Sequence, residues 1–163
     1  MTKPAGTEAI RDVPCTILHP GAAVGDFLIL DEPVSFWGGV SAEGTVIDRH
    51  HPQCGTSVSG RILVMTAGRG SSSSSSVLAE QIRAGTAPAA IVMAEADSIL
   101  VLGAVVAAEM YGIAMPILRL ALSDLAALPL NGSARIDATE PALTWPPALE
   151  TLDRTTTMAV YGQ

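Results

Sequence analysis

The residues best suited to chemistry lie at positions 67–76, which read Ala-Gly-Arg-Gly followed by six serines. The preceding residues 61–66 are largely apolar and predict a buried strand. The following residues 77–84 predict a helix that Gly85 ends. A turn from a strand into a helix presents unpaired backbone N–H groups and the positive end of the helix dipole. We therefore expect this turn to bind a carboxylate or a phosphate.

The side chains of the turn suit an anionic ligand. Gly68 and Gly70 let the backbone approach a ligand closely, and Arg69 offers a guanidinium that can hold an oxyanion by two hydrogen bonds. A serine hydroxyl at a helix start can donate, accept or carry a proton. The alternative interpretation is a flexible linker in a scaffold, in which residues 71–76 would be disordered and sensitive to proteases. The position of the run inside one strand–helix unit favours the turn.

The composition predicts one globular domain that binds neither nucleic acid nor membrane. The chain has 163 residues, of which 48% are hydrophobic and 15% are charged, and its net charge is −7. Nine scattered lysines and arginines give no basic stripe for a phosphate backbone. The longest apolar run, residues 99–108, is far below the roughly 20 residues that span a bilayer. With no signal peptide visible in the first twelve residues, we expect a cytoplasmic protein.

The two cysteines do not indicate a metal site. Cys15 and Cys54 form no Cys-x-x-Cys pair and have no histidine cluster nearby, so this chain alone offers no zinc or iron–sulfur site. A reduced pair is the simpler interpretation, with a disulfide as the alternative.

The remaining pattern predicts a mixed sheet with helices largely in the second half of the chain. Strands 15–18 and 26–30 are expected to pair with each other. A helix at 99–111 is capped by Asp97 or Ser98, ends at Gly112, and is apolar nearly all round, so we expect it to be covered on all sides. Further strands are expected at 45–48, 87–93, 116–120 and 133–138, with a short helix at 122–128.

Two loops and the chain ends complete the organisation. Phe36 and Trp37 precede two glycines, in a loop that either caps the core or walls a ligand pocket. His50 and His51 fall in a segment that we expect to be a solvated loop, with at most one histidine facing a cleft. The expected organisation is a flexible terminus at 1–12, a domain at 13–140 and an irregular extension at 141–163.

Five segments in the same order resemble the small subunit, or swivel domain, of the aconitase X family. They are residues 31–39, 47–52, 68–72 and 82–90, together with Pro116. The resemblance implies an α/β fold, a swivelling β/β/α domain with a mixed sheet and flanking helices. It also implies a hydro-lyase whose large subunit carries an iron–sulfur cluster, while this chain binds no cofactor alone. Bacterial pairs of this kind are cis-3-hydroxy-L-proline dehydratases, and the archaeal branch resembles phosphomevalonate dehydratase.

The resemblance also assigns roles to residues of the serine turn. Ser71 falls at the position of the catalytic base, which would take the proton next to the substrate carboxylate. The backbone N–H groups of Ser72 and Ser73, with Arg69, are expected to hold that carboxylate, and Ser72 is a possible stand-in for the base. Gly70 and the loop residues Phe36, Trp37 and Gly38 complete the expected substrate site.

A different class of function stays open on the residues alone. A swivelling domain can carry or dock a ligand without catalysing a reaction, as phosphohistidine domains do. Only His50 or His51 could then serve as the phosphorylated group, because His19 lies in an early turn.

Overall fold

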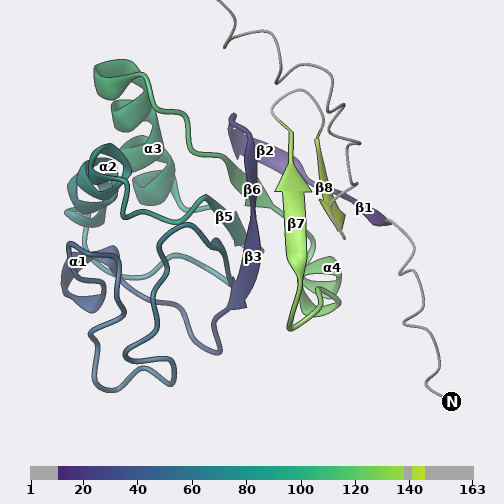
Figure 1. Ribbon diagram of the computed structural model, residues 1–163, viewed down its shortest axis with the longest axis horizontal. Coiled ribbons are helices and arrows are strands. Elements are labelled where there is room, and N and C mark those ends of the chain that lie inside the picture. The colour runs from purple at the N-terminus through teal and green to yellow at the C-terminus, as the bar shows by residue number, and fades with distance from the viewer. Residues whose placement is uncertain (1–10, 138–140, 146–163) are drawn as a thin grey trace, which may run out of the picture.

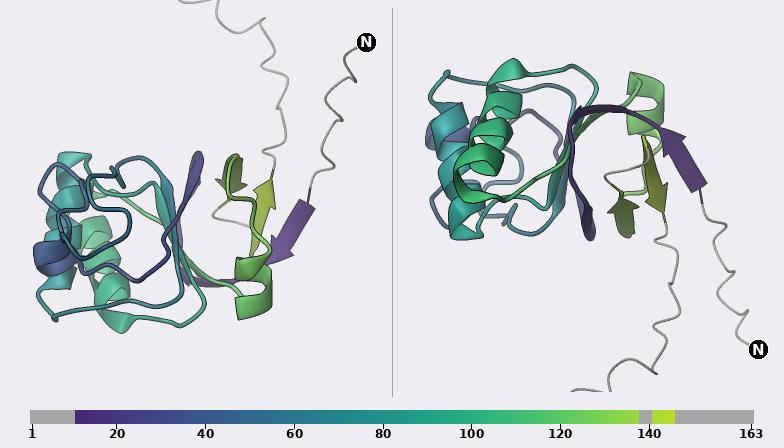
Figure 2. Two further views of the ribbon diagram at one scale, coloured as in Figure 1. Left: turned by 90° about the horizontal axis from the view of Figure 1, so that it is seen from below. Right: turned by 90° about the horizontal axis from the view of Figure 1, so that it is seen from above.

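The structure, a computed structural model, describes residues 11–137 and 141–145 as three layers. Three helices cover one face of a central strand layer, and a second strand layer covers the other face (Figures 1 and 2). This is the expected β/β/α architecture, so the predicted fold class is confirmed. The elements are β1 Arg11–Pro14, β2 Thr16–His19, β3 Ala23–Ile29, α1 Phe36–Gly39, β4 Ile62–Met65, α2 Ser74–Ala84, β5 Ala90–Met93, α3 Ser98–Tyr111, β6 Ile117–Arg119, α4 Leu122–Ala126, β7 Ser133–Ile136 and β8 Ala142–Trp145.

Strand β3 belongs to both strand layers. Its first residues, Ala23 to Asp26, pair antiparallel with β7, and its last residues, Phe27 to Ile29, pair parallel with β4. The strand order is β1-β8-β7-β3-β4-β5-β6-β2. Strands β3, β4, β5 and β6 run parallel, so their carboxyl ends meet at one edge of the sheet.

Strands β4 and β5 are apolar throughout because both of their faces are covered. Strands β4 and β5 read Ile-Leu-Val-Met and Ala-Ile-Val-Met, and every residue in them is buried. Alternate side chains enter different clusters. On the helix side, strands β4, β5 and β6 contribute Leu63, Met65, Ile91, Met93 and Ile117. On the side of the second strand layer they contribute Ile62, Val64, Ala90, Val92 and Leu118.

Local signals in the sequence located the two main helices. Helix α2 ends as predicted at Gly85, which is left-handed with φ +75, but it begins at Ser74 rather than at residue 77. Helix α3 begins after Asp97, whose carboxylate accepts hydrogen bonds from the N–H groups of Ile99 (2.8 Å) and Leu100 (3.3 Å). It ends at Gly112 as predicted, with φ +68.

Several expectations about long-range structure are wrong. The strands expected to pair with each other do not: β2 pairs with β6, and β3 pairs with β4 and β7. The strand expected at residues 45–48 is absent, and this segment makes only isolated β-bridges, Val40 with Val46 and Thr45 with Ser57. Nor is helix α3 covered on all sides within the described part of the chain, because Leu102 and Val105 are 52% and 39% exposed.

The chain ends also differ from the expectation. Ala142–Trp145 is strand β8 rather than irregular extension, because Leu143 and Trp145 alternate into the core. Arg11 and Asp12 lie in β1, which pairs with β8, rather than in a flexible terminus. Residues 1–10 and 146–163 lie outside the described residues. Among those that are described, no helix is long and apolar enough to cross a membrane.

Replacing Ile91 by alanine should lower the free energy of unfolding by about 2–5 kcal/mol, because it leaves a cavity at the centre of the sheet. Ile91 is fully buried, at 0% exposure. Urea unfolding of the purified chain measures the change. The control is Leu130→Ala at a residue that is 80% exposed, where less than about 0.5 kcal/mol is expected. Equal effects of the two changes would contradict this description of the core.

Candidate active site

The serine turn lies where the parallel strands end. It follows β4 and leads into α2, as the sequence predicted. Ser35, which follows β3, forms a parallel bridge with Arg69 in the turn. The carboxyl edge of an open parallel sheet is where such folds bind ligands. The expected turn is therefore at a place where a ligand can reach several loops at once.

Two glycines allow this turn to lie against its neighbours. A Cβ atom on Gly68 would overlap the carboxylate of Asp97, the residue that caps α3. A Cβ atom on Gly70 would lie 2.7 Å from Cβ of Ser35 and closer still to its hydroxyl, and Gly70 has φ +105. Both positions therefore require glycine, one for space and the other for space and backbone conformation. The glycines serve the close packing of the turn itself.

Ser71 is exposed at the tip of the turn and its hydroxyl is held by the backbone. The N–H of Ser73 donates to Oγ of Ser71 at 3.2 Å, and the N–H of Ser74 donates to the Ser71 carbonyl at 2.9 Å. A backbone N–H that donates to Oγ stabilises the negatively charged alkoxide form of the serine. The positive end of the α2 helix dipole, which lies nearby, acts in the same direction. This arrangement suits a serine that accepts a proton.

The expected carboxylate donors are only partly available. The N–H of Ser73 is already engaged by Ser71, whereas the N–H groups of Ser71 and Ser72 make no hydrogen bond within the described part of the chain. Arg69 is exposed and makes no ion pair with any described residue. The free donors at the turn are therefore the amides of Ser71 and Ser72 and the guanidinium of Arg69.

The aromatic loop lies beside the turn, but its two rings differ. Phe36 is 1% exposed and packs in the hydrophobic core, so it anchors the loop to the core. Trp37 is 58% exposed, and its N–H donates to Oγ of Ser74 at 3.2 Å. The hydroxyl of Ser35 donates to the Trp37 carbonyl at 2.9 Å, and Gly38 follows with φ +78. Trp37 is thus the aromatic that a ligand at the turn can reach.

The segment expected to be a solvated loop instead contains a buried histidine. His51 is 4% exposed, with Nε2 lying 2.8 Å from the carbonyl of Glu32. The N–H of Gln53 donates to Nδ1 of His51 at 3.1 Å, so Nε2 must carry the proton and donate to Glu32. Both ring nitrogens are therefore engaged, and the ring holds Glu32 in the loop that leads to Trp37. Of the two adjacent histidines only His50 is exposed.

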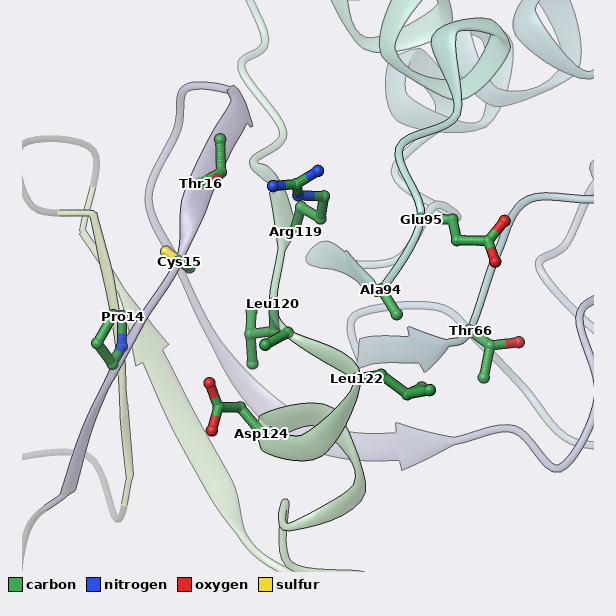
Figure 3. Close-up of a pocket in the computed structure, with 11 residues that line it drawn as sticks. Pro14, Cys15, Thr16, Thr66, Ala94, Glu95, Arg119, Leu120, Leu122 and Asp124 are labelled. Carbon is green, nitrogen blue, oxygen red and sulfur yellow. The ribbon is translucent and has the colours of Figure 1, made fainter.

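A second group of residues at the same edge was not predicted from the sequence. A hollow of about 570 Å³ opens beside the ends of β4, β5 and β6 (Figure 3). Exposed polar or charged side chains stand there where the apolar part of each strand ends: Thr66 after β4, Glu95 after β5 and Arg119 as the last residue of β6. That change of polarity after a buried strand was the available signal. The lining residues are Pro14, Cys15, Thr16, Thr66, Ala94, Glu95, Arg119, Leu120, Ala121, Leu122 and Asp124.

An iron–sulfur cluster does not fit the residues of this chain. No three His, Cys, Asp or Glu side chains gather anywhere in the part of the chain that the structure describes. Cys15 and Cys54 are both free thiols, and burial raises the pKa of the Cys15 thiol. A raised pKa disfavours the thiolate that would bind a metal.

Comparison with known proteins agrees with this architecture. The profile of the aconitase X swivel domain matches residues 12–144. The cis-3-hydroxy-L-proline dehydratase of Pseudomonas aeruginosa is 48% identical over 120 residues, which are 72% of this chain but only 20% of that protein. The phosphomevalonate dehydratase small subunit of Methanothermobacter thermautotrophicus is 39% identical over 97 residues, or 59% of this chain and 74% of that subunit.

A solved structure shares the fold as well. The crystal structure of Thermococcus kodakaraensis aconitase X in its holo-form aligns with a TM-score of 0.71 and 29% identity, covering 82% of this chain and 96% of that one. The overall arrangement of layers is therefore shared with that aconitase X structure. The chain belongs to the aconitase X family, as its swivel domain, and the expected resemblance is confirmed.

Replacing Gly70 by alanine should cost more stability than the same change at Gly55. Both glycines have positive φ, +105 and +89, so alanine meets backbone strain of about 1–2 kcal/mol at either position. Nothing lies within 4 Å of a Cβ atom on Gly55, whereas Ser35 blocks one on Gly70. We expect Gly70→Ala to lose about 1–3 kcal/mol more in urea unfolding. Equal losses would show that the turn does not depend on the contact with Ser35.

Proposed function

We propose that this chain is the small, swivelling part of an aconitase X type dehydratase that removes water from cis-3-hydroxy-L-proline. The product would be 1-pyrroline-2-carboxylate, formed after the initial enamine tautomerises. Dehydratases acting on this amino acid are the relatives with 48% and 41% identity. The chain spans about a fifth of their length, so the proposed enzyme needs a further, larger part.

The observation that carries the proposal is the placement of Ser71. Its hydroxyl stands exposed at the carboxyl edge of the sheet, with the N–H of Ser73 donating to Oγ at 3.2 Å. In the proposed reaction Oγ takes the proton from the carbon that bears the carboxylate. The amide of Ser72 and the guanidinium of Arg69 bind the carboxylate, and Trp37 shields one side of the ligand.

The larger part is proposed to be a separate large subunit that forms a heterodimer with this chain in the cytoplasm. It is also proposed to carry an iron–sulfur cluster, which would act as a Lewis acid on the departing 3-hydroxyl group. The domain would close over that part when substrate binds, bringing Ser71 to the reacting carbon. On this proposal the chain alone has no activity.

A second candidate substrate is phosphomevalonate. The small subunits of phosphomevalonate dehydratases resemble this chain in length as well as in sequence, with 74% of the Methanothermobacter subunit matched at 39% identity. The same serine turn would serve either substrate, because both are hydroxy acids from which water is lost. Parallel assays with the two substrates distinguish the candidates.

A third candidate function is a domain that carries a phosphate group on a histidine. His50 is the histidine that could serve, because both ring nitrogens of His51 are engaged. Incubation with a phosphate donor followed by intact-mass measurement would reveal a phosphohistidine carrier. A stable adduct on His50 would support that function over the dehydratase.

Replacing Ser71 by alanine in the assembled enzyme should lower kcat by about 10²–10⁴-fold, because the proton acceptor is removed. Turnover of cis-3-hydroxy-L-proline and association with the large subunit are measured together, and association should be unchanged. The matched control is Ser76→Ala, which removes an exposed hydroxyl of the same run that donates to the Ser73 carbonyl at 3.0 Å. That variant should keep near-normal turnover.

Two outcomes would contradict the role of Ser71. Near-normal turnover of Ser71→Ala would exclude it as the base. A large loss in Ser72→Ala, with only a small loss in Ser71→Ala, would move the role to the neighbouring hydroxyl.

A further inference from the structure

Arg119 is an unusual residue in the central sheet. Strands β4, β5 and β6 contain no other charged residue, and its neighbours Leu118 and Leu120 are each 1% exposed. Strand β6 is paired on both sides, with β5 and with β2, so Arg119 does not lie on an edge strand. It occupies the carboxyl end of the strand, where its side chain enters the hollow shown in Figure 3.

The guanidinium of Arg119 has no partner in the described part of the chain. It makes neither an ion pair nor a hydrogen bond with a described residue, whereas Arg83 pairs with Glu80 and Arg61 donates to the Phe27 carbonyl at 2.7 Å. Glu95 and Asp124 line the same hollow but do not pair with it. In Figure 3 their carboxylates lie apart from the guanidinium, on other sides of the hollow. Arg119 is therefore free to bind something else.

Thr16 supplies a second donor beside Arg119. The two residues are direct partners in the antiparallel pairing of β2 with β6, so their side chains leave the same face of the sheet. Figure 3 shows the Thr16 side chain and the guanidinium at the same side of the hollow. Both residues are exposed, and the Thr16 hydroxyl makes no hydrogen bond with a described residue. The burial that raises the pKa of Cys15 keeps that neighbouring thiol from adding a negative charge.

We propose that Arg119 and Thr16 form an oxyanion-binding site at the carboxyl edge, separate from the serine turn. A planar guanidinium binds a carboxylate or a phosphate through two parallel hydrogen bonds, and the hydroxyl adds a third donor. The pairing of β2 with β6 fixes the spacing of the two side chains. The ligand is a small molecule with a carboxylate or a phosphate group. The site goes beyond the proposed dehydration, because it binds a ligand whether or not Ser71 acts as a base.

The test is a titration of the full chain labelled with ¹⁵N, observed by NMR. Inorganic phosphate and cis-3-hydroxy-L-proline serve as separate probes, so that the source of the oxyanion is distinguished. At least one of the two probes should shift the amide signals of Thr16 and Arg119 in a saturable way. The probe that does so shows whether the site takes a phosphate or a carboxylate. Arg119→Gln should weaken binding by about 10–100-fold, and Arg119→Lys should weaken it less, because the charge is kept but the two parallel bonds are lost. Thr16→Val should weaken it by less than about tenfold.

The matched control is Arg83→Gln, which removes one positive charge from α2 and should leave the titration unchanged. The spectra also report whether each variant is folded. The proposal is overturned if neither probe shifts these amides, or if the shifts survive in Arg119→Gln. It is also overturned if no anion binds and Arg119→Gln only weakens association with the large subunit, since Arg119 would then be a subunit contact. Loss of turnover in Ser71→Ala bears on the base alone and leaves this result unaffected.

Discussion

The candidate site depends on how closely the serine turn lies against two neighbouring segments. Gly68 lies against the carboxylate of Asp97, and Gly70 lies against Ser35, with no room for a Cβ atom at either place. These contacts tie the end of β4 to the residues that follow β3 and β5. The position of the serine turn is therefore set by the sheet rather than by the flexible composition of the serine run.

Further constraints act on the same region. Asp97 caps α3 through the N–H groups of Ile99 and Leu100 while its carboxylate faces Gly68, so one side chain fixes both a helix start and the turn. His51 holds the carbonyl of Glu32 and thereby the loop that leads to Trp37. A rigid support of this kind suits the proposed role of Ser71, because small displacements of a catalytic group cost large factors in rate.

Much of the fold could be predicted from local sequence signals, because they act within a few residues. Asp97 and Gly112 mark the ends of α3, and the apolar runs of β4 and β5 mark strands covered on both faces. Strand pairing was harder, because it joins distant residues. The antiparallel pairing of β1 with β8 brings Arg11 next to Trp145, and nothing near either residue indicates the other.

In the candidate site, too, the features that depend on local sequence could be predicted, and those that depend on contacts between distant segments could not. The serine turn follows from the order of one strand and one helix, and Trp37 was named from its neighbouring glycines. Arg119 and Thr16 meet only because β2 returns to pair with β6, which the expected pairing with β3 would have prevented. The burial of His51 likewise depends on a contact with Glu32 from a separate loop.

We propose that this chain supplies one half of a catalytic site that a larger chain completes. The most direct measurement is turnover of cis-3-hydroxy-L-proline by the purified chain alone, by the large subunit alone, and by the two mixed without oxygen. Activity is expected in the mixture and in neither part alone. Full activity of the large subunit without this chain would contradict the proposal, as would an inactive mixture in which a tight complex and an intact cluster are both demonstrated.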